Sequence, residues 1–191
     1  CSAALAAGHA GLRALQLAES KVGLVAGVTL VLAPGVGTSF AIAGMTSARG
    51  RSHTFDGRAD GYARGEACGA VALRCEEAEA ADGGQQRGMA ASATTTSSRS
   101  SLLGSAVRQD GRSASLTAPS GQAQQMLLVA ALQDAGASVD ALVQVEVHGT
   151  GTLLGDPIEA GSLVGAVLAH REETLVVGGV KANVGHAEPA A

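Results

Sequence analysis

The chain has 191 residues, of which 46% are apolar but only 2% aromatic, and a formal net charge of −4. This length predicts one domain with a sizeable core, which must be built from Ala, Val and Leu because aromatic residues are so scarce. The negative charge and the absence of a Lys/Arg cluster argue against nucleic acid or an anionic membrane surface as a partner. The longest apolar run, Val22 to Ala33, is too short to span a bilayer.

The three cysteines, Cys1, Cys68 and Cys75, show no CxxC pairing and no zinc-ligand spacing with the five histidines, so we predict no metal site. An odd number of cysteines without a signal peptide favours a reducing compartment, and we expect a cytoplasmic protein without excluding an organelle such as a plastid. The chain opens on Cys1 rather than methionine and closes on Pro189-Ala190-Ala191. We interpret it as a piece of a longer protein.

The first predicted helix covers residues 2–20, where Leu5, Leu12, Leu15 and Ala18 lie roughly on one stripe. Cys1 would then precede a helix N-terminus, where unpaired amides and the helix dipole stabilise a thiolate and lower the cysteine pKa from its free value of about 8.5. By its position alone, Cys1 is either a nucleophile or a terminal cysteine with no function.

Residues Val22 to Leu32 are predicted to form a buried strand that ends at Pro34-Gly35. The mixed segment Thr38 to Met45 gives no clear prediction. Arg49 to Glu66 is polar, rich in glycine and irregular, which indicates a long ordered loop or a functional loop.

A second strand is predicted at Ala67 to Arg74, followed by a short acidic helix at Glu76 to Ala81. The stretch 82–101 is rich in Gly and Gln and then in Ala, Ser and Thr, which predicts a surface loop or a disordered segment. Residues 92–101 have the composition of a Ser/Thr-rich loop insertion. Leu102 to Val107 is predicted to be a short strand.

The second half of the chain alternates between helices and strands. Helices are predicted at Pro119 to Gly136 and Pro157 to His170, and strands at Leu142 to Val147 and Leu175 to Val180. Strands that alternate with helices of this length predict an α/β class with crossover connections.

His148 directly follows one of these strands and opens a loop in which glycines alternate with Thr150 and Thr152. The glycines let the backbone approach a ligand closely, and the two hydroxyls are potential hydrogen-bond donors. An imidazole held at a strand end is a candidate reactive group, although a loop histidine that is satisfied by its neighbours remains an alternative. His9 and His53 are expected to be structural or exposed, and His170, in the last turn of its predicted helix, is expected to interact with the helix dipole.

Three separated motifs, in the expected order, resemble the β-ketoacyl synthase domain of type I polyketide synthases, in the thiolase-like superfamily. Cys1-Ser2-Ala3-Ala4-Leu5 resembles the end of its nucleophile elbow. The segment HGTGTLLGDPIE, from His148 to Glu159, resembles its first histidine motif, and GVKANVGH, from Gly179 to His186, resembles its lysine and second-histidine motif. Shorter matches in 54–66 and 104–119 extend the resemblance over nearly the whole chain.

The resemblance implies a layered α-β-α-β-α fold of which residues 1–191 are a partial domain. The part that precedes the nucleophile and the Gly-rich loop that follows the second histidine are expected to be missing. Departures from the family pattern are Ala3 and Ala4 in place of serines, Arg108 in place of asparagine and Pro189 in place of alanine. None of them falls on a matched catalytic position.

The implied activity is a decarboxylative Claisen condensation in polyketide biosynthesis, an acyltransferase reaction. Cys1, as a thiolate, would take the acyl chain from a thioester. His148 and His186, both neutral, would donate hydrogen bonds to the thioester oxygen of a malonyl-type extender as negative charge develops there.

The resemblance also implies supporting roles for four residues. Lys181 and Glu159 would form a charged pair that holds the histidines, and Thr150 and Thr152 would bind the amides of phosphopantetheine. Substrates would arrive on the phosphopantetheine of acyl carrier protein, so no cofactor would be bound directly. The other expected partners are a second copy in a homodimer and the neighbouring domains of a polyketide synthase.

Several other functions remain open at this point. A fatty-acid-type β-ketoacyl synthase would carry similar motifs, and a non-catalytic dimerisation or chain-length subunit would lack the nucleophile that Cys1 provides. A thiolase would replace one histidine with a second cysteine. A hydrolase of the Gly-x-Ser-x-Gly type is disfavoured because the sequence contains no such motif.

Overall fold

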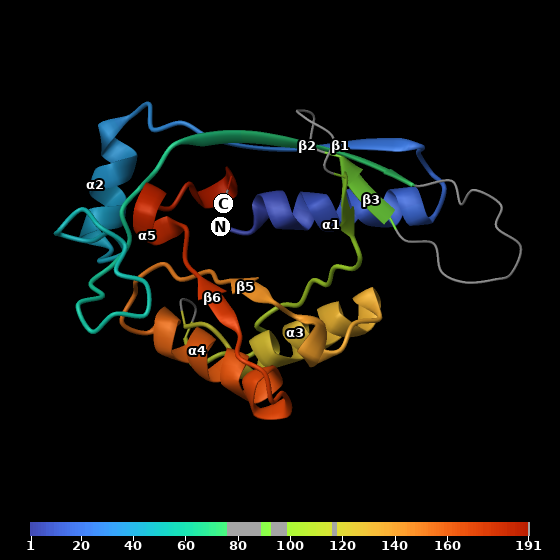
Figure 1. Ribbon diagram of the computed structural model, residues 1–191. Helices are drawn as coiled ribbons and strands as arrows, with labels where there is room; N and C mark the ends of the chain where they lie inside the picture. The colour runs from blue at the N-terminus through green and yellow to red at the C-terminus, as the bar shows by residue number, and fades with distance from the viewer. Residues whose placement is uncertain (76–88, 93–98, 116–117, 191) are drawn as a thin grey trace, which may run out of the picture.

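Two sheets of different topology organise the chain. The computed structural model describes residues 1–75, 89–92, 99–115 and 118–190 (Figure 1). The helices and strands of this part, in chain order, are α1 (Ala3–Gln16), β1 (Val22–Thr29), α2 (Pro34–Ile42), β2 (Ala67–Cys75), β3 (Met89–Ser92), β4 (Arg99–Leu102), α3 (Gly121–Ala135), β5 (Gln144–Glu146), α4 (Gly155–Ala166), β6 (Val176–Gly178) and α5 (Lys181–Val184), with short 3₁₀ turns η1 (Val139–Ala141), η2 (Leu168–His170) and η3 (Glu188–Ala190). Strands β1 to β4 form an antiparallel sheet in sequence order, whereas β5 and β6 form a parallel pair.

Helix α1 lies along one face of the antiparallel sheet (Figure 1). Its side chains Leu12 and Leu15 pack with Leu73 of β2 in a small core that Val25 and Leu102 border. Gly27 of β1 brings η3 into the same layer, because an added Cβ at this glycine would meet Ala4 and Ala190 at 3.0 Å. This packing brings the beginning of α1 close to residues 187–190.

Helices α3 and α4 cover the β5–β6 pair on the other side of the molecule (Figure 1). The second core cluster lies here and consists of Val147, Leu163, Ala166 and Val167. Helix α4 forms the crossover between the parallel strands. None of the helices in the described ranges combines the length and hydropathy needed to cross a membrane.

The predicted α/β class is confirmed, but crossover connections describe only part of the fold. Strand β2 pairs antiparallel with β1, from Val22 opposite Arg74 to Thr29 opposite Ala67, and two further antiparallel strands follow. An alternation of strands and helices along the sequence does not specify the direction in which strands pair, so the sequence could not distinguish the two sheets.

Helix α1 ends at Gln16, four residues before the predicted end. The N–H of Ala18 donates to the carbonyl of Leu15 and the N–H of Glu19 to that of Ala14, which closes the helix as a Schellman motif. Ala18 takes the left-handed conformation that this motif requires, with φ of 59°. The apolar stripe alone gave no sign of this stop.

The prediction of a buried strand at Val22 to Leu32 is wrong on two points. Strand β1 ends at Thr29, and only alternate residues are shielded: Leu24 is 75% exposed, and Val22 and Val28 are also exposed. Helix α1 covers a single face of the sheet, so the apolar residues of the other face have no cover in the described part of the chain.

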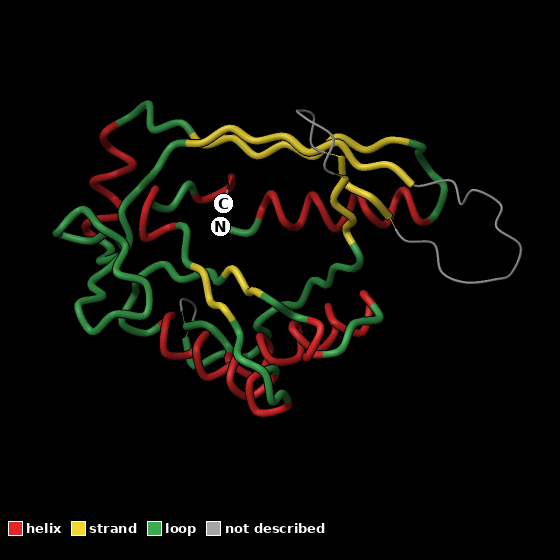
Figure 2. Tube along the Cα trace, viewed as in Figure 1, coloured by secondary structure: helices red, strands yellow, loops and turns green. Residues whose placement is uncertain are grey.

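Residues 38–42, from the segment without a clear prediction, belong to α2, which begins with Pro34 in its first turn. The polar stretch 49–66 is an ordered loop, as predicted (Figure 2). It is held by the bridges Thr46–Tyr62 and Arg64–His186 and by the buried Ser52, whose hydroxyl accepts the N–H of Ala63.

The prediction for residues 92–107 needs correction. Ser92 and residues 99–101, expected in a Ser/Thr-rich loop, belong to β3 and β4, and the strand expected at 102–107 ends at Leu102. The following segment is held on α3 instead, because Asp134 accepts the N–H of Ser105 at 2.8 Å. The acidic helix expected at 76–81 and residues 93–98 lie outside the described residues.

The remaining elements match their predictions with shifted bounds. Strand β2 extends one residue beyond the predicted range, and α3 begins after Ser120, whose hydroxyl accepts the N–H of Ala123 at its start. Strands β5 and β6 have three residues each. Helix α4 ends at Ala166, and the exposed His170 lies in the 3₁₀ turn that follows.

Candidate active site

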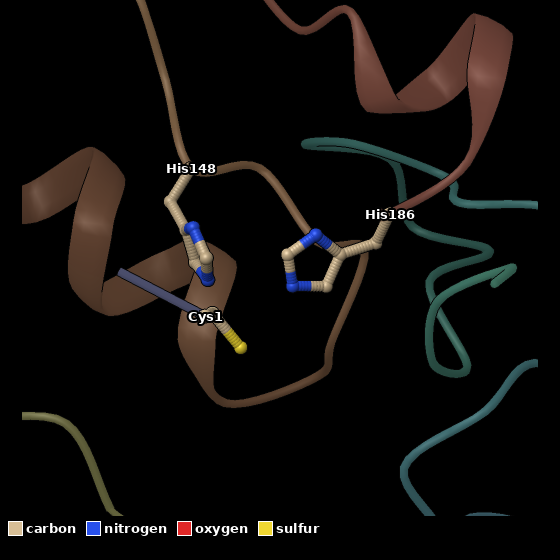
Figure 3. Close-up of side chains that lie close together, drawn as sticks. All are labelled: Cys1, His148 and His186. Atoms are coloured by element: carbon tan, nitrogen blue, oxygen red, sulfur yellow. The ribbon is translucent and has the colours of Figure 1, made fainter. Parts of the chain in front are cut away.

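Three side chains from distant parts of the sequence meet where the two sheets approach each other. Cys1 precedes α1, His148 follows β5, and His186 follows α5 (Figure 3). The Cys1 sulfur and one ring nitrogen of each histidine all lie within 4.8 Å of one another. The two imidazoles meet edge to face, with centroids 5.4 Å apart and planes at 88°. The structure therefore groups the three residues that the sequence suggested as catalytic.

Cys1 is exposed and stands two residues before the first turn of α1. Ser2 occupies the N-cap position but makes no side-chain capping bond, so the N–H groups at this helix end are not capped by it. Unpaired N–H groups and the helix dipole favour an anion at this position. Figure 3 shows the Cys1 side chain close to the two imidazoles.

His148 is delivered by a strand that the core anchors. Val147 is buried in the cluster beneath it, and the chain then turns through Gly149 and Gly151, with φ of 48° and 78°. Glu159 of α4 accepts the N–H groups of His148 and Gly149 at 2.6 and 2.8 Å. This carboxylate fixes the backbone that carries the histidine.

Asp156 holds the rest of this loop, a role that the sequence analysis missed. Its side chain is only 4% exposed and accepts the N–H groups of Gly151 (3.0 Å), Thr152 (3.3 Å) and Phe55 (2.7 Å). The Thr54 hydroxyl donates to the carbonyl of Gly149 at 2.5 Å. The aspartate at the first turn of a helix was a visible signal for the local bonds, but nothing in the sequence indicated its bond to a residue 101 positions away.

His186 is completely buried. Its backbone N–H donates to the carbonyl of Ala63 at 2.7 Å, and its carbonyl accepts the N–H of Gly65 at 2.9 Å. In the ring, Nδ1 accepts the N–H of Glu188 at 3.3 Å, whereas the buried Nε2 has no hydrogen-bond partner among the described residues. Its capacity for a hydrogen bond is therefore not used by the described part of the chain.

Both imidazoles are held in the neutral form. Burial, the charge on His148 when it is protonated, and Lys181 lower the pKa of His186 to about 4. Burial is also the largest cause that lowers the pKa of His148, followed by Lys181. A neutral imidazole carries one N–H and can donate a single hydrogen bond.

The expected ion pair between Lys181 and Glu159 is not formed. The four salt bridges in the described part of the chain involve other residues, and the Glu159 carboxylate is instead engaged with backbone N–H groups. Lys181 is the first residue of α5 and is buried, with 8% exposure. Its effect on the site is electrostatic, because its positive charge disfavours protonation of both histidines.

Thr150 and Thr152 lie in the loop between His148 and α4. Thr150 is buried, and the Thr152 hydroxyl accepts the N–H of Gly155 at 3.1 Å, at the start of α4. As an acceptor, this hydroxyl keeps its own proton for a further bond. Whether either hydroxyl binds substrate stays a prediction.

The remaining histidines do not join the group. The Nδ1 of His9 lies 2.8 Å from the Ser105 hydroxyl, which ties α1 to the segment before α3. Cys, His and His are also residue types that bind zinc, and these three ligand atoms lie within 4.8 Å of one another.

Comparison with known proteins identifies related chains. Residues 1–79 match the family model described as "Beta-ketoacyl synthase, N-terminal domain", and residues 99–191 match "Beta-ketoacyl synthase, C-terminal domain". The chain is 42% identical over 193 residues to a phenolphthiocerol/phthiocerol polyketide synthase of Mycobacterium tuberculosis. It is 39% identical over 193 residues to the highly reducing polyketide synthase alnA of Emericella nidulans.

Solved structures of ketosynthase domains are also similar to this chain. The oxazolomycin ketosynthase domain OzmH KS7 of Streptomyces albus superposes with a TM-score of 0.86 at 34% identity. The ketosynthase from module 6 of the bacillaene synthase of Bacillus subtilis superposes with a TM-score of 0.84 at 33% identity. All of this chain is covered in each comparison, but it spans only 32% of each solved chain and 8% and 7% of the two polyketide synthases.

Proposed function

This chain belongs to the β-ketoacyl synthase family, with the thiolase-like fold of ketosynthase domains, and we propose that it carries the condensing centre of a polyketide synthase. The reaction would be a decarboxylative Claisen condensation of a cysteine-bound acyl chain with a malonyl-type extender. The observation that carries this proposal is the convergence of Cys1, His148 and His186 within 4.8 Å.

In the first half-reaction, the Cys1 thiolate attacks the carbonyl carbon of an acyl thioester on the phosphopantetheine of acyl carrier protein. A new C–S bond to Cys1 forms, the bond to the pantetheine sulfur breaks, and the carrier thiol leaves with a proton. The position of Cys1 before α1 favours the anionic form that this attack requires.

In the second half-reaction, the malonyl-type thioester loses carbon dioxide, and its electrons form an enolate. The enolate carbon attacks the Cys1 thioester, a carbon–carbon bond forms, and the thiolate is released again. His148 and His186 donate to the thioester oxygen on which the negative charge develops, and donors of this kind contribute a few kcal/mol each.

The charge state of the histidines supports their role as hydrogen-bond donors beside the nucleophile Cys1. Their lowered pKa values keep both rings neutral near pH 7. Neutral rings can donate hydrogen bonds but do not form ion pairs with the Cys1 thiolate. Glu159 supports His148 by holding its backbone, and Lys181 supports both rings through its charge.

The finer parts of the proposal concern substrate delivery. Thr150 and Thr152 would bind the pantetheine amides, and no other cofactor would be bound directly. Acyl carrier protein, a second copy of the domain and neighbouring polyketide synthase domains would be the partners, in the cytoplasm. The polyketide synthases among the relatives support this interpretation over a fatty-acid-type enzyme, and the grouping of Cys1 with two histidines disfavours a non-catalytic role.

The experiment that tests the proposal uses the full-length protein, incubated with an acylated carrier protein. Intact-protein and peptide mass spectrometry should locate one acyl group on Cys1, and Cys1→Ala should abolish it. Cys68→Ala, at another exposed cysteine, is the matched control and should retain the adduct. A folded protein whose Cys1 stays unmodified would favour the non-catalytic alternative instead.

A further inference from the structure

The contacts around His186 point to a set of positioning residues to which the family motifs assigned no role. We propose that Tyr62, Arg64 and Glu188 hold the backbone N–H of Glu188 against Nδ1 of His186, so that the ring proton stays on Nε2 and faces Cys1. This inference rests on the proposed function, because it assigns a role to these residues in presenting the hydrogen-bond donor.

The backbone of His186 is fixed by the segment that carries Tyr62 and Arg64. The bonds from His186 to Ala63 and from Gly65 to His186 form a parallel bridge between Arg64 and His186. The Tyr62 ring also packs edge-on against the imidazole, with centroids 5.1 Å apart. Movement of this segment would therefore move the histidine.

The bond at Nδ1 decides the tautomer. A nitrogen that accepts the N–H of Glu188 carries no proton, so the single proton of the neutral ring lies on Nε2. Figure 3 shows the ring nitrogen farther from Cβ on the side of Cys1. If this bond were lost, the proton could move to Nδ1, and Nε2 would then be an acceptor that cannot stabilise an oxyanion.

Glu188 needs an anchor to make this bond. Its φ of 45° lies in the left-handed region, which is strained for a residue with a side chain. Its carboxylate is held at both oxygens: Oε1 accepts the hydroxyl of Tyr62 at 2.9 Å, and Oε2 lies 3.5 Å from Nη2 of Arg64. Burial and the neighbouring carboxylate raise the pKa of Tyr62 to about 12, so its hydroxyl remains a donor.

Stability alone does not account for this ion pair. The side chains of Arg64 and Glu188 are each 15% exposed, and the buried Nε and Nη1 of Arg64 have no hydrogen-bond partner in the described part of the chain. The guanidinium lies over the Phe40 ring, 5.0 Å from its centroid. Because a buried ion pair with unsatisfied donors is often no more stabilising than an apolar pair, its contribution here is to geometry.

The test separates the two half-reactions in the full-length protein. Tyr62→Phe removes one anchor but keeps the ring, and Glu188→Gln removes the charge. Both should lower kcat for malonyl-thioester decarboxylation about 10- to 100-fold, as expected for a misplaced catalytic group. Acylation of Cys1 and KM should change less than about twofold, and Glu172→Gln, at an exposed glutamate, should behave as wild type.

The double variant Arg64→Leu/Glu188→Leu distinguishes positioning from stability. Its melting temperature should be equal to or above that of the wild type, because both members of the ion pair are replaced by apolar residues, while decarboxylation stays slow. Wild-type kcat in the double variant, or in both single variants, would overturn the inference. If the wild type itself neither accepts an acyl group on Cys1 nor decarboxylates the extender, the proposed function fails rather than this inference.

Discussion

The antiparallel sheet and the site loops bury opposite kinds of residue. On the sheet, apolar side chains such as Leu24 and Val22 are exposed, and only the face beneath α1 is covered. Around the site, Ser52, Asp156 and His186 are polar and almost inaccessible to solvent. The region with the more apolar sequence is therefore the less buried one.

Backbone hydrogen bonds account for this difference. Two of the buried polar side chains near the site serve the backbone of a loop: Asp156 accepts three N–H groups and Ser52 accepts one. Loops without regular structure have many unpaired N–H groups, so they can be packed closely only where side chains satisfy them. The sheet satisfies its own backbone and needs only an apolar layer.

The largest expected loss of stability comes from the site loops. Asp156→Ala would leave three N–H groups without their acceptor and should lower the free energy of unfolding by about 3–5 kcal/mol. Denaturant unfolding of the full-length protein measures the loss, with the exposed Asp110→Ala as the control. A loss below about 1 kcal/mol would show that polar contacts do not hold the site loops.

Leu73→Ala should come next, on the covered face of the sheet. Leu73 packs with Leu12 and Leu15, and removal of such a side chain costs about 2–4 kcal/mol. The exposed Leu103→Ala is the matched control in the same unfolding assay. If Leu73→Ala were more destabilising than Asp156→Ala, the apolar core would outweigh the polar contacts, and the contrast between the two regions would be reversed.

Stability should also depend on pH, through the buried His186. Because the pKa of folded His186 is about 4 and the ordinary value is 6.5, the unfolded chain binds a proton that the folded chain excludes between these values. The free energy of unfolding should therefore be highest above pH 6.5 and fall as the pH is lowered toward 4. His186→Gln should flatten this slope, whereas His170→Gln, at an exposed histidine, should not.

The smallest effect is expected on the uncovered face of the sheet. Leu24→Thr keeps a residue suited to a strand and should change the free energy of unfolding by no more than about 0.5 kcal/mol. Thermal melting of the full-length protein is sufficient to measure it. A loss above about 1 kcal/mol would mean that another part of the full-length protein covers this face.

Much of the fold could be predicted from local patterns. Apolar runs located β1, β2, β5 and β6, and capping residues located α3. Exposure of β1 could not be predicted, because an apolar strand has the same sequence pattern whether one of its faces or both are covered. The hairpin of β3 and β4 was missed because small and polar residues such as Ala and Ser, in a composition typical of loops, can also pair as strands.

The site could be predicted only in part, and mostly through the resemblance. Cys1, His148 and His186 were indicated by motifs, and the structure groups them. The roles of Asp156 and Glu188 depend on contacts with Phe55 and Tyr62, which no local pattern encodes. The wrong pairing of Lys181 with Glu159 has the same origin, because opposite charges in two motifs do not show that the side chains meet.

The long sequence separations around the site also set the order in which it can form. The bonds from Thr54 to Gly149, Phe55 to Asp156 and Tyr62 to Glu188 join residues 95, 101 and 126 positions apart. Contacts of this kind form late in folding, since the intervening chain must first be brought together. During synthesis, the Cys1 thiol leaves the ribosome long before either histidine donor. The centre can therefore be assembled only after the whole segment has emerged.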